Sequence, residues 1–166
     1  MFDRPLYRTR QFFGSFRPRF RDDERTEAEA VLGEELWPLF ESMSERDQRH
    51  SLDVLAVLRN RSCRDQHLLM AALLHDAGKG RLAGVRVRLW HRVAYVLLTA
   101  STPSVLKRLA NGRGGIAALH SHAERGAVVA EALGAPSAVV DLIRRHDDHA
   151  ASDDRLLMLR AADESC

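Results

Sequence analysis

The sequence has little cysteine and no long apolar stretch. Its 166 residues include two cysteines, Cys63 and Cys166, which cannot make a disulfide framework. We therefore expect no disulfide partner and a reducing, cytoplasmic setting. No apolar run approaches the roughly 20 residues of a membrane-spanning helix, so no transmembrane segment is expected. The opening stretch, MFDRPLYRTR, lacks the apolar centre of a signal peptide.

A large excess of one charge sign is also missing. The formal net charge is +2, which is too small to indicate nucleic-acid binding by itself. Apolar residues make up 45% of the chain and charged residues 29%, as is typical of a globular protein. The length suits about one domain of ordinary size. We predict one domain over residues 22–166, preceded by an arm at residues 1–21.

The arm has a composition of its own. Residues 1–20 carry a formal charge of +4 and hold five of the six phenylalanines. The favoured interpretation is that the aromatic side chains pack on the domain while the arginines face water. The alternative is contact with anionic lipid, nucleic acid or a protein partner. In the membrane version of this alternative, the amphipathic stretch Val85–Leu98 with Trp90 adds a second contact.

Strand patterns are absent as well. No segment alternates polar and apolar residues with the period of two that a half-buried strand requires, so we predict an all-α fold. Apolar periodicity with helix start and stop signals gives the helix positions. The predicted helices cover 22–43 with breaks at Gly33 and Pro38, 44–60, 65–74, 85–99, 103–110, 116–133, 136–149 and 153–163.

Several titratable residues lie on the apolar faces of these helices. Each shares its face with apolar residues at spacings of three, four or seven positions. These residues are His50, His75, Asp76, His122, His146 and Asp163. A buried carboxylate without a partner is costly, and for a single histidine a nearby carbonyl is a sufficient partner. For the whole set, a shared metal ion explains the pattern better.

The same residues form an ordered series of motifs. The series is His50, His75-Asp76-Ala-Gly-Lys79, His122-Ala-Glu-Arg-Gly126, Leu-Ile-Arg-Arg-His146 and Ala-Ala-Asp163. In this order and over residues 50–163, the sequence resembles the HD superfamily of metal-dependent phosphohydrolases. The resemblance implies an all-α domain with metal at its centre and hydrolysis of a phosphate ester by metal-activated water. It does not explain residues 1–43.

The resemblance also implies a ligand set. His50, His75, Asp76 and Asp163 correspond to the ligands of one ion. His122 and His146 correspond to ligands of a second ion, with Asp76 between the two. One or two ions per chain are therefore expected. Mixed histidine and aspartate ligands suit Mn, Fe, Co or Ni, with Mg as a further option.

The resemblance further implies that the partner is a small phosphorylated substrate, with nucleotides as the leading class. Asp76 and Lys79 are the expected catalytic residues, and Lys79 would face substrate phosphate. A solvated position at a helix end explains Lys79 equally well. Arg125 and Arg145 are further substrate-binding candidates, each with a solvated surface position as the simpler interpretation.

Two departures and one competing function remain. No Gly-Tyr-Pro follows the His-Asp pair, which disfavours cyclic di-GMP as substrate, and Asp147 stands where several two-metal relatives have a second histidine. The competing function is non-catalytic: a metal-stabilised helical module that binds a nucleotide or a partner.

Overall fold

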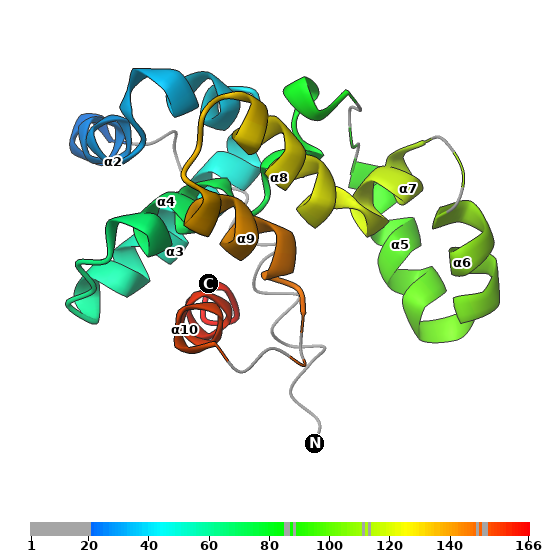
Figure 1. The fold of residues 1–166 in the computed structure, drawn as a ribbon. Coiled ribbons are helices and arrows are strands. Elements are labelled where there is room, and N and C mark those ends of the chain that lie inside the picture. The colour runs from blue at the N-terminus through cyan, green and yellow to red at the C-terminus, as the bar shows by residue number, and fades with distance from the viewer. Residues whose placement is uncertain are drawn as a thin grey trace.

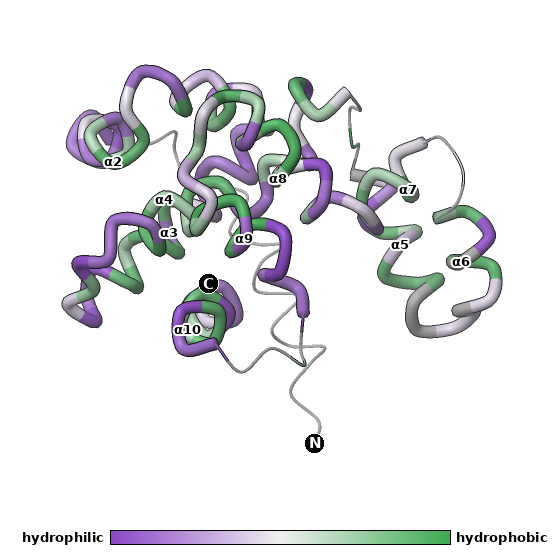
Figure 2. The backbone as a smooth tube through the Cα atoms, in the orientation of Figure 1, coloured by the Kyte–Doolittle hydropathy of each residue, from purple (hydrophilic) through white to green (hydrophobic). Residues whose placement is uncertain are grey.

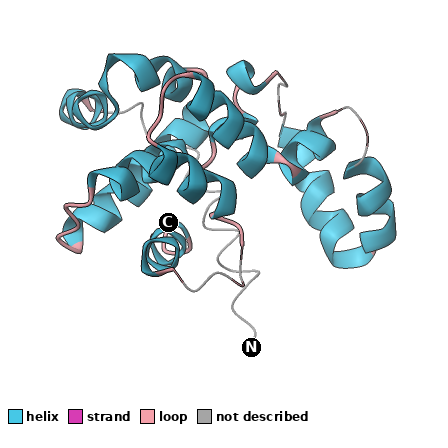
Figure 3. Cartoon of the chain, in the orientation of Figure 1, coloured by secondary structure: helices cyan, strands magenta, loops and turns pink. Residues whose placement is uncertain are grey.

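The computed structural model describes most of the chain beyond the arm. The described residues are 21–84, 87, 89–110, 112, 114–148, 150 and 153–166. Within these ranges every regular element is a helix, which confirms the all-α prediction (Figure 3). The predicted arm lies outside the described residues except for Arg21. Among the described residues, no helix is both long and apolar enough to cross a membrane, and Cys63 and Cys166 are free thiols.

Most of the helices pack into one bundle, which surrounds the apolar core (Figure 1). The bundle comprises α2 (Asp22–Glu41), α3 (Glu45–Asn60), α4 (Gln66–Leu74), α8 (His122–Ala132), α9 (Ser137–Arg145) and α10 (Asp154–Asp163). Leucines 68, 69, 73 and 74 make α4 the most buried of these helices, and α4 contacts α2, α3, α9 and α10. This central place follows from its sequence, QHLLMAALL, which is apolar on all sides.

The helices α3 and α4 begin with side-chain caps at Ser44 and Asp65, the first residues of the predicted helices 44–60 and 65–74. The Ser44 hydroxyl accepts from the Asp47 backbone N–H, and α3 ends at Asn60 as expected. The Asp65 carboxylate accepts from the N–H groups of His67 and Leu68 at the start of α4. In α2 the predicted break occurs at Gly33, whose φ of 70° lies in the left-handed region. Pro38, the other predicted break, lies within the helix that continues to Glu41.

Two predicted helices are shorter or divided. The predicted helix 116–133 is two helices, α7 (Gly115–His120) and α8, because Ser121 leaves the helical region with φ −108° and ψ 16°. The predicted helix 136–149 ends at Arg145, and His146 caps it. Neither boundary carries a glycine or proline, so the sequence offered no ordinary stop signal there.

A second group of helices extends away from the bundle. It consists of α5 (Leu89–Ser101), α6 (Pro103–Ala110) and α7, which contact one another, and we call it the projection (Figure 1). Two short 3-10 helices, η2 (Ala77–Lys79) and η3 (Arg81–Ala83), lie between α4 and α5 in the chain. On the inner side of the projection, the Arg92 guanidinium contacts Asp47 of α3 at 2.6 Å.

Candidate metal centre

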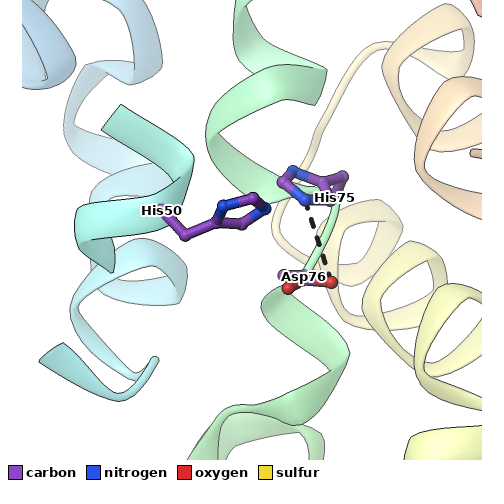
Figure 4. A group of neighbouring side chains, drawn as sticks. All are labelled: His50, His75 and Asp76. Carbon is purple, nitrogen blue, oxygen red and sulfur yellow. Dashed lines mark ion pairs between the residues drawn. The ribbon is translucent and has the colours of Figure 1, made fainter. Parts of the chain in front are cut away.

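The structure brings the titratable residues of the predicted ligand set together in the bundle. The Nε2 of His50 in α3 donates to the carboxylate of Asp163 at the end of α10, with 2.7 Å between Nε2 and the Asp163 Oδ1. His75 and Asp76 follow α4 directly and face His50 (Figure 4). His122 begins α8 and His146 caps α9. We refer to these residues as the cluster: His50, His75, Asp76, His122, His146 and Asp163.

Three histidines of the cluster are oriented by the ends of helices. The Nδ1 of His75 lies 2.9 Å from the Ala72 carbonyl, and those of His122 and His146 lie 2.7 Å from the carbonyls of Leu119 and Ile143. Because a carbonyl can only accept, each Nδ1 carries the proton. These carbonyls belong to the last turns of α4, α7 and α9, where the helix leaves them without partners. Each ring therefore caps a helix and directs its Nε2 into the cluster.

The distances between donor atoms divide the cluster in two. Two ligands about 2.1 Å from one ion and about 90–110° apart lie about 3.0–3.4 Å from each other. The Nε2 of His122 lies 3.4 Å from Asp76 Oδ1 and 3.2 Å from His146 Nε2, which matches that spacing. The Nε2 of His75 lies 3.8 Å from Asp76 Oδ1 and 3.6 Å from Asp163 Oδ1, which is wider. His50, His75 and Asp76 form one group that could hold an ion, and Asp76, His122 and His146 form the other.

Electrostatics keep both carboxylates of the cluster charged. Burial opposes ionisation of Asp76, but Lys79 and His75 outweigh it and hold its pKa well below the usual range. Burial likewise opposes ionisation of Asp163, and its contacts with His50 and His75 lower its pKa. His75 is disfavoured by burial as a cation, yet the two carboxylates raise its pKa to about 9. Burial and the charge of His75 lower the pKa of His146 to about 4. The cluster thus holds two carboxylates beside four imidazoles, which are ligand types that divalent cations take. A cationic imidazole has no free lone pair, so an ion bound by His75 would displace its proton.

Two glycines allow the two groups to meet at Asp76. A Cβ on Gly78 of η2 would overlap the backbone carbonyl of His122 and lie 2.7 Å from the Gly126 nitrogen. A Cβ on Gly126 would lie 2.9 Å from the Gly78 nitrogen. The backbones of η2 and α8 can therefore touch only because both side chains are absent. This contact sets the distance between Asp76 and His122.

Lys79 lies at the cluster rather than in solvent. Its Nζ is 2.5 Å from Asp76 Oδ1, and its side chain is 15% exposed. This partly buried position differs from the solvated one that the sequence also allowed. Lys79 is a cation with a small exposed surface next to the proposed bridging carboxylate.

The two predicted substrate-binding arginines contact other groups. The guanidinium of Arg125 donates to the Ala83 carbonyl and fastens η3 to α8. The guanidinium of Arg145 pairs with Asp141 one turn earlier in α9 at 3.1 Å, with both side chains well exposed. Arg125 therefore links two structural elements, and Arg145 forms an exposed ion pair within its own helix.

Asp147 is a candidate ligand that the sequence prediction left out. Its Oδ2 lies 3.4 Å from the Nε2 of His122, and its Oδ1 lies 3.4 Å from the Nε2 of His146. Its side chain is 63% exposed, so it closes the second group on the solvent side. The signal was present in the sequence, because Asp147 follows His146 directly, but it was interpreted there as a missing histidine.

Comparison with models of known families, with curated proteins and with solved structures gives no match for this chain. The function must therefore be inferred from the cluster and from the motifs that carry it.

Proposed function

We propose that this protein is a metal-dependent phosphohydrolase of the HD superfamily type, acting in the cytoplasm on a phosphate ester, with nucleotides as the first substrate class to test. The proposal is carried by one observation: four imidazole Nε2 atoms and two carboxylates converge inside the bundle from widely separated parts of the chain. Three of the imidazoles are fixed by helix-end carbonyls. A module that only needed stability would gain more from apolar packing at these positions.

The residues of the cluster have different roles in the proposed reaction. Asp76 lies within reach of both histidine groups and serves as the shared ligand. Bound Mn, Fe, Co, Ni or Mg ions would supply an activated water and polarise a phosphoryl oxygen. Lys79 places a positive charge beside Asp76, where it can neutralise charge that develops on the phosphoryl group. Arg125 and Arg145 are not required by this proposal.

The decisive experiment is elemental mass spectrometry of freshly purified protein beside the Asp76→Ala variant. We expect about two first-row ions per chain in the wild type and loss of both in the variant. A single ion would indicate a mononuclear site. Absence of any ion, even after loading with Mn, Fe, Co or Ni, would overturn the catalytic proposal in favour of a non-catalytic binding module.

A second variant separates metal binding from turnover. Lys79→Ala should retain the metal, because Lys79 is no ligand, and should lower kcat by about 10²-fold, as loss of one charge-stabilising group does. The assay is a screen of nucleoside monophosphates, phosphodiesters and p-nitrophenyl phosphate esters. Arg145→Ala serves as the matched control with unchanged kinetics. Unaltered turnover in Lys79→Ala would remove Lys79 from the mechanism.

A further inference from the structure

The positive charge of the chain is concentrated in one segment. Residues 77–123 contain eight basic residues and no acidic residue. The basic residues are Lys79, Arg81, Arg86, Arg88, Arg92, Lys107, Arg108 and Arg113. Residues 21–76 hold 13 acidic and 7 basic residues, and residues 124–166 hold 9 acidic and 5 basic residues. The net charge of +2 therefore hides a strongly basic segment that includes the whole projection.

The same segment exposes a stripe of apolar side chains. Trp90, Val93 and Leu97 of α5 follow one another at spacings of three and four, so they share one helix face. Trp90 is 57% exposed and Leu97 is 60% exposed. Val105 and Leu109 of the neighbouring α6 are exposed as well. Figure 2 shows apolar residues along α5 and α6 of the projection.

The stripe is unusual for this molecule. Of the ten large apolar side chains that are exposed among the described residues, six belong to α5 and α6. Exposed apolar residues that stand singly need no explanation, but a contiguous set in a basic setting indicates an interaction surface. The opposite side of α5 is already engaged, because Arg92 pairs with Asp47 and the Tyr95 hydroxyl lies 3.3 Å from His120 Nδ1. The apolar side is thus the outer face of the projection.

We infer that this outer face of α5 and α6, with Trp90, Val93, Leu97, Val105 and Leu109, docks on the surface of an anionic lipid membrane. Lys79 and Arg92 are paired with Asp76 and Asp47, which leaves six basic residues of the segment. An anionic bilayer satisfies both properties at once: lipid phosphates attract these basic residues while the aliphatic side chains enter the acyl boundary. Tryptophan is the side chain favoured at that depth. The inference is independent of the proposed hydrolase activity.

Other occupants fit the charge less well. A second copy of the chain in a two-fold symmetric contact would bring two basic segments together, and residues 1–20 carry a formal +4 of the same sign. A nucleic acid would meet the charge but would leave Val93, Leu97, Val105 and Leu109 in water. The membrane is therefore the partner that covers the whole face.

The test is flotation of the full-length protein with phosphatidylcholine vesicles and with vesicles that also contain phosphatidylglycerol. We expect binding only to the anionic vesicles and a decrease with added salt. The double substitution Val93→Ser, Leu97→Ser should weaken binding at least about tenfold, because both side chains lose their buried area in the bilayer. The matched control is Val128→Ser with Leu157→Ser, which alters two exposed apolar residues of the bundle and should bind like the wild type.

Two further measurements keep the outcome interpretable if the double variant folds poorly. Arg108→Gln alters an exposed residue and should weaken binding about fivefold, as removal of one surface cation does. Fluorescence of Trp90, isolated by Trp37→Phe, should shift to the blue only with anionic vesicles. Equal binding to neutral vesicles, wild-type binding by the α5 double variant, or preference for poly(U) RNA over vesicles would each overturn the inference. The arm is unaltered in every variant, so a loss of binding is assigned to α5 and α6.

Discussion

The bundle and the projection use apolar residues in opposite ways. In the bundle, the leucines of α3 and α4, together with Leu156 and Leu159 of α10, are almost completely buried. In the projection, Leu106 is buried and most of the other large side chains of α5 and α6 face solvent. Dense packing in the bundle fixes the positions of side chains that must meet within a few ångströms. Sparse packing in the projection leaves a surface free for contact.

The largest effect that separates the two regions should come from leucine truncation. Leu69→Ala in α4 should lower the free energy of unfolding by about 2–5 kcal/mol, the range for a fully buried leucine. Leu106→Ala in α6 should cost about 1–2 kcal/mol, because few buried side chains surround it. Urea denaturation measures both, and equal losses would contradict the difference in packing.

Within the bundle, the contact of η2 with α8 should be the most sensitive backbone position. Gly78→Ala should cost about 1–3 kcal/mol through overpacking and should also lower metal content, because it separates Asp76 from His122. Gly114→Ala, where an added Cβ meets no atom within 4 Å, is the matched control near the projection. Thermal unfolding and elemental analysis together test the prediction, which fails if Gly78→Ala retains the stability and metal content of Gly114→Ala.

A smaller effect should mark Asp147. If Asp147 completes the second group, Asp147→Ala should lower the affinity for one ion about tenfold, as loss of one outlying ligand does. The affinity for the other ion should be unchanged. The neighbouring Asp148→Ala removes a carboxylate that accepts from the Ala150 backbone N–H, and it should bind metal like the wild type. Equilibrium dialysis against Mn²⁺ distinguishes the two variants. Identical dialysis curves would remove Asp147 from the site.

The smallest expected effect is a pH dependence of protein stability that arises in the bundle, away from the cluster. A two-pronged hydrogen bond from Arg49 lowers the pKa of Glu24 from 4.5 to about 2, although burial opposes this. Since the folded pKa is depressed, the pair stabilises the protein fully above pH 4.5 and is lost as the pH falls towards 2. Glu24→Gln should remove this acid-dependent part, at most about 1 kcal/mol for a pair near the surface. Melting temperatures of both proteins from pH 7 to 2 measure it, and parallel curves would contradict it.

The sequence predicted the fold more completely than the site. Caps such as Ser44 and Asp65, and the apolar pattern between them, gave α3 and α4 with correct ends. The same rules extended a helix through Ser121 and another past His146, because nothing in the local sequence stops a helix there. At these ends a histidine ring contacts the carbonyl three residues earlier in the chain, His122 that of Leu119 and His146 that of Ile143.

The same contrast between local pattern and three-dimensional contact applies to the cluster. The motif order identified residues that the fold then places together, although the predicted helices 116–133 and 136–149 had set His122 and His146 within helices. Their positions at helix ends are what direct Nε2 inward. The close approach of Gly78 to Gly126 depends on a three-dimensional contact that no local pattern reveals. Asp147 stands beside His146 in the sequence, but its distance to His122 follows only from the fold.

The contact of His50 with Asp163 joins positions 113 residues apart and depends on the packing of α10 against α3. Closing a loop of that length costs conformational entropy, which the contact and the packing of α10 must offset. The other group, Asp76, His122 and His146, contains no residue of α10. Undocking of α10 would therefore take Asp163 away from His50 and leave that group with all of its members.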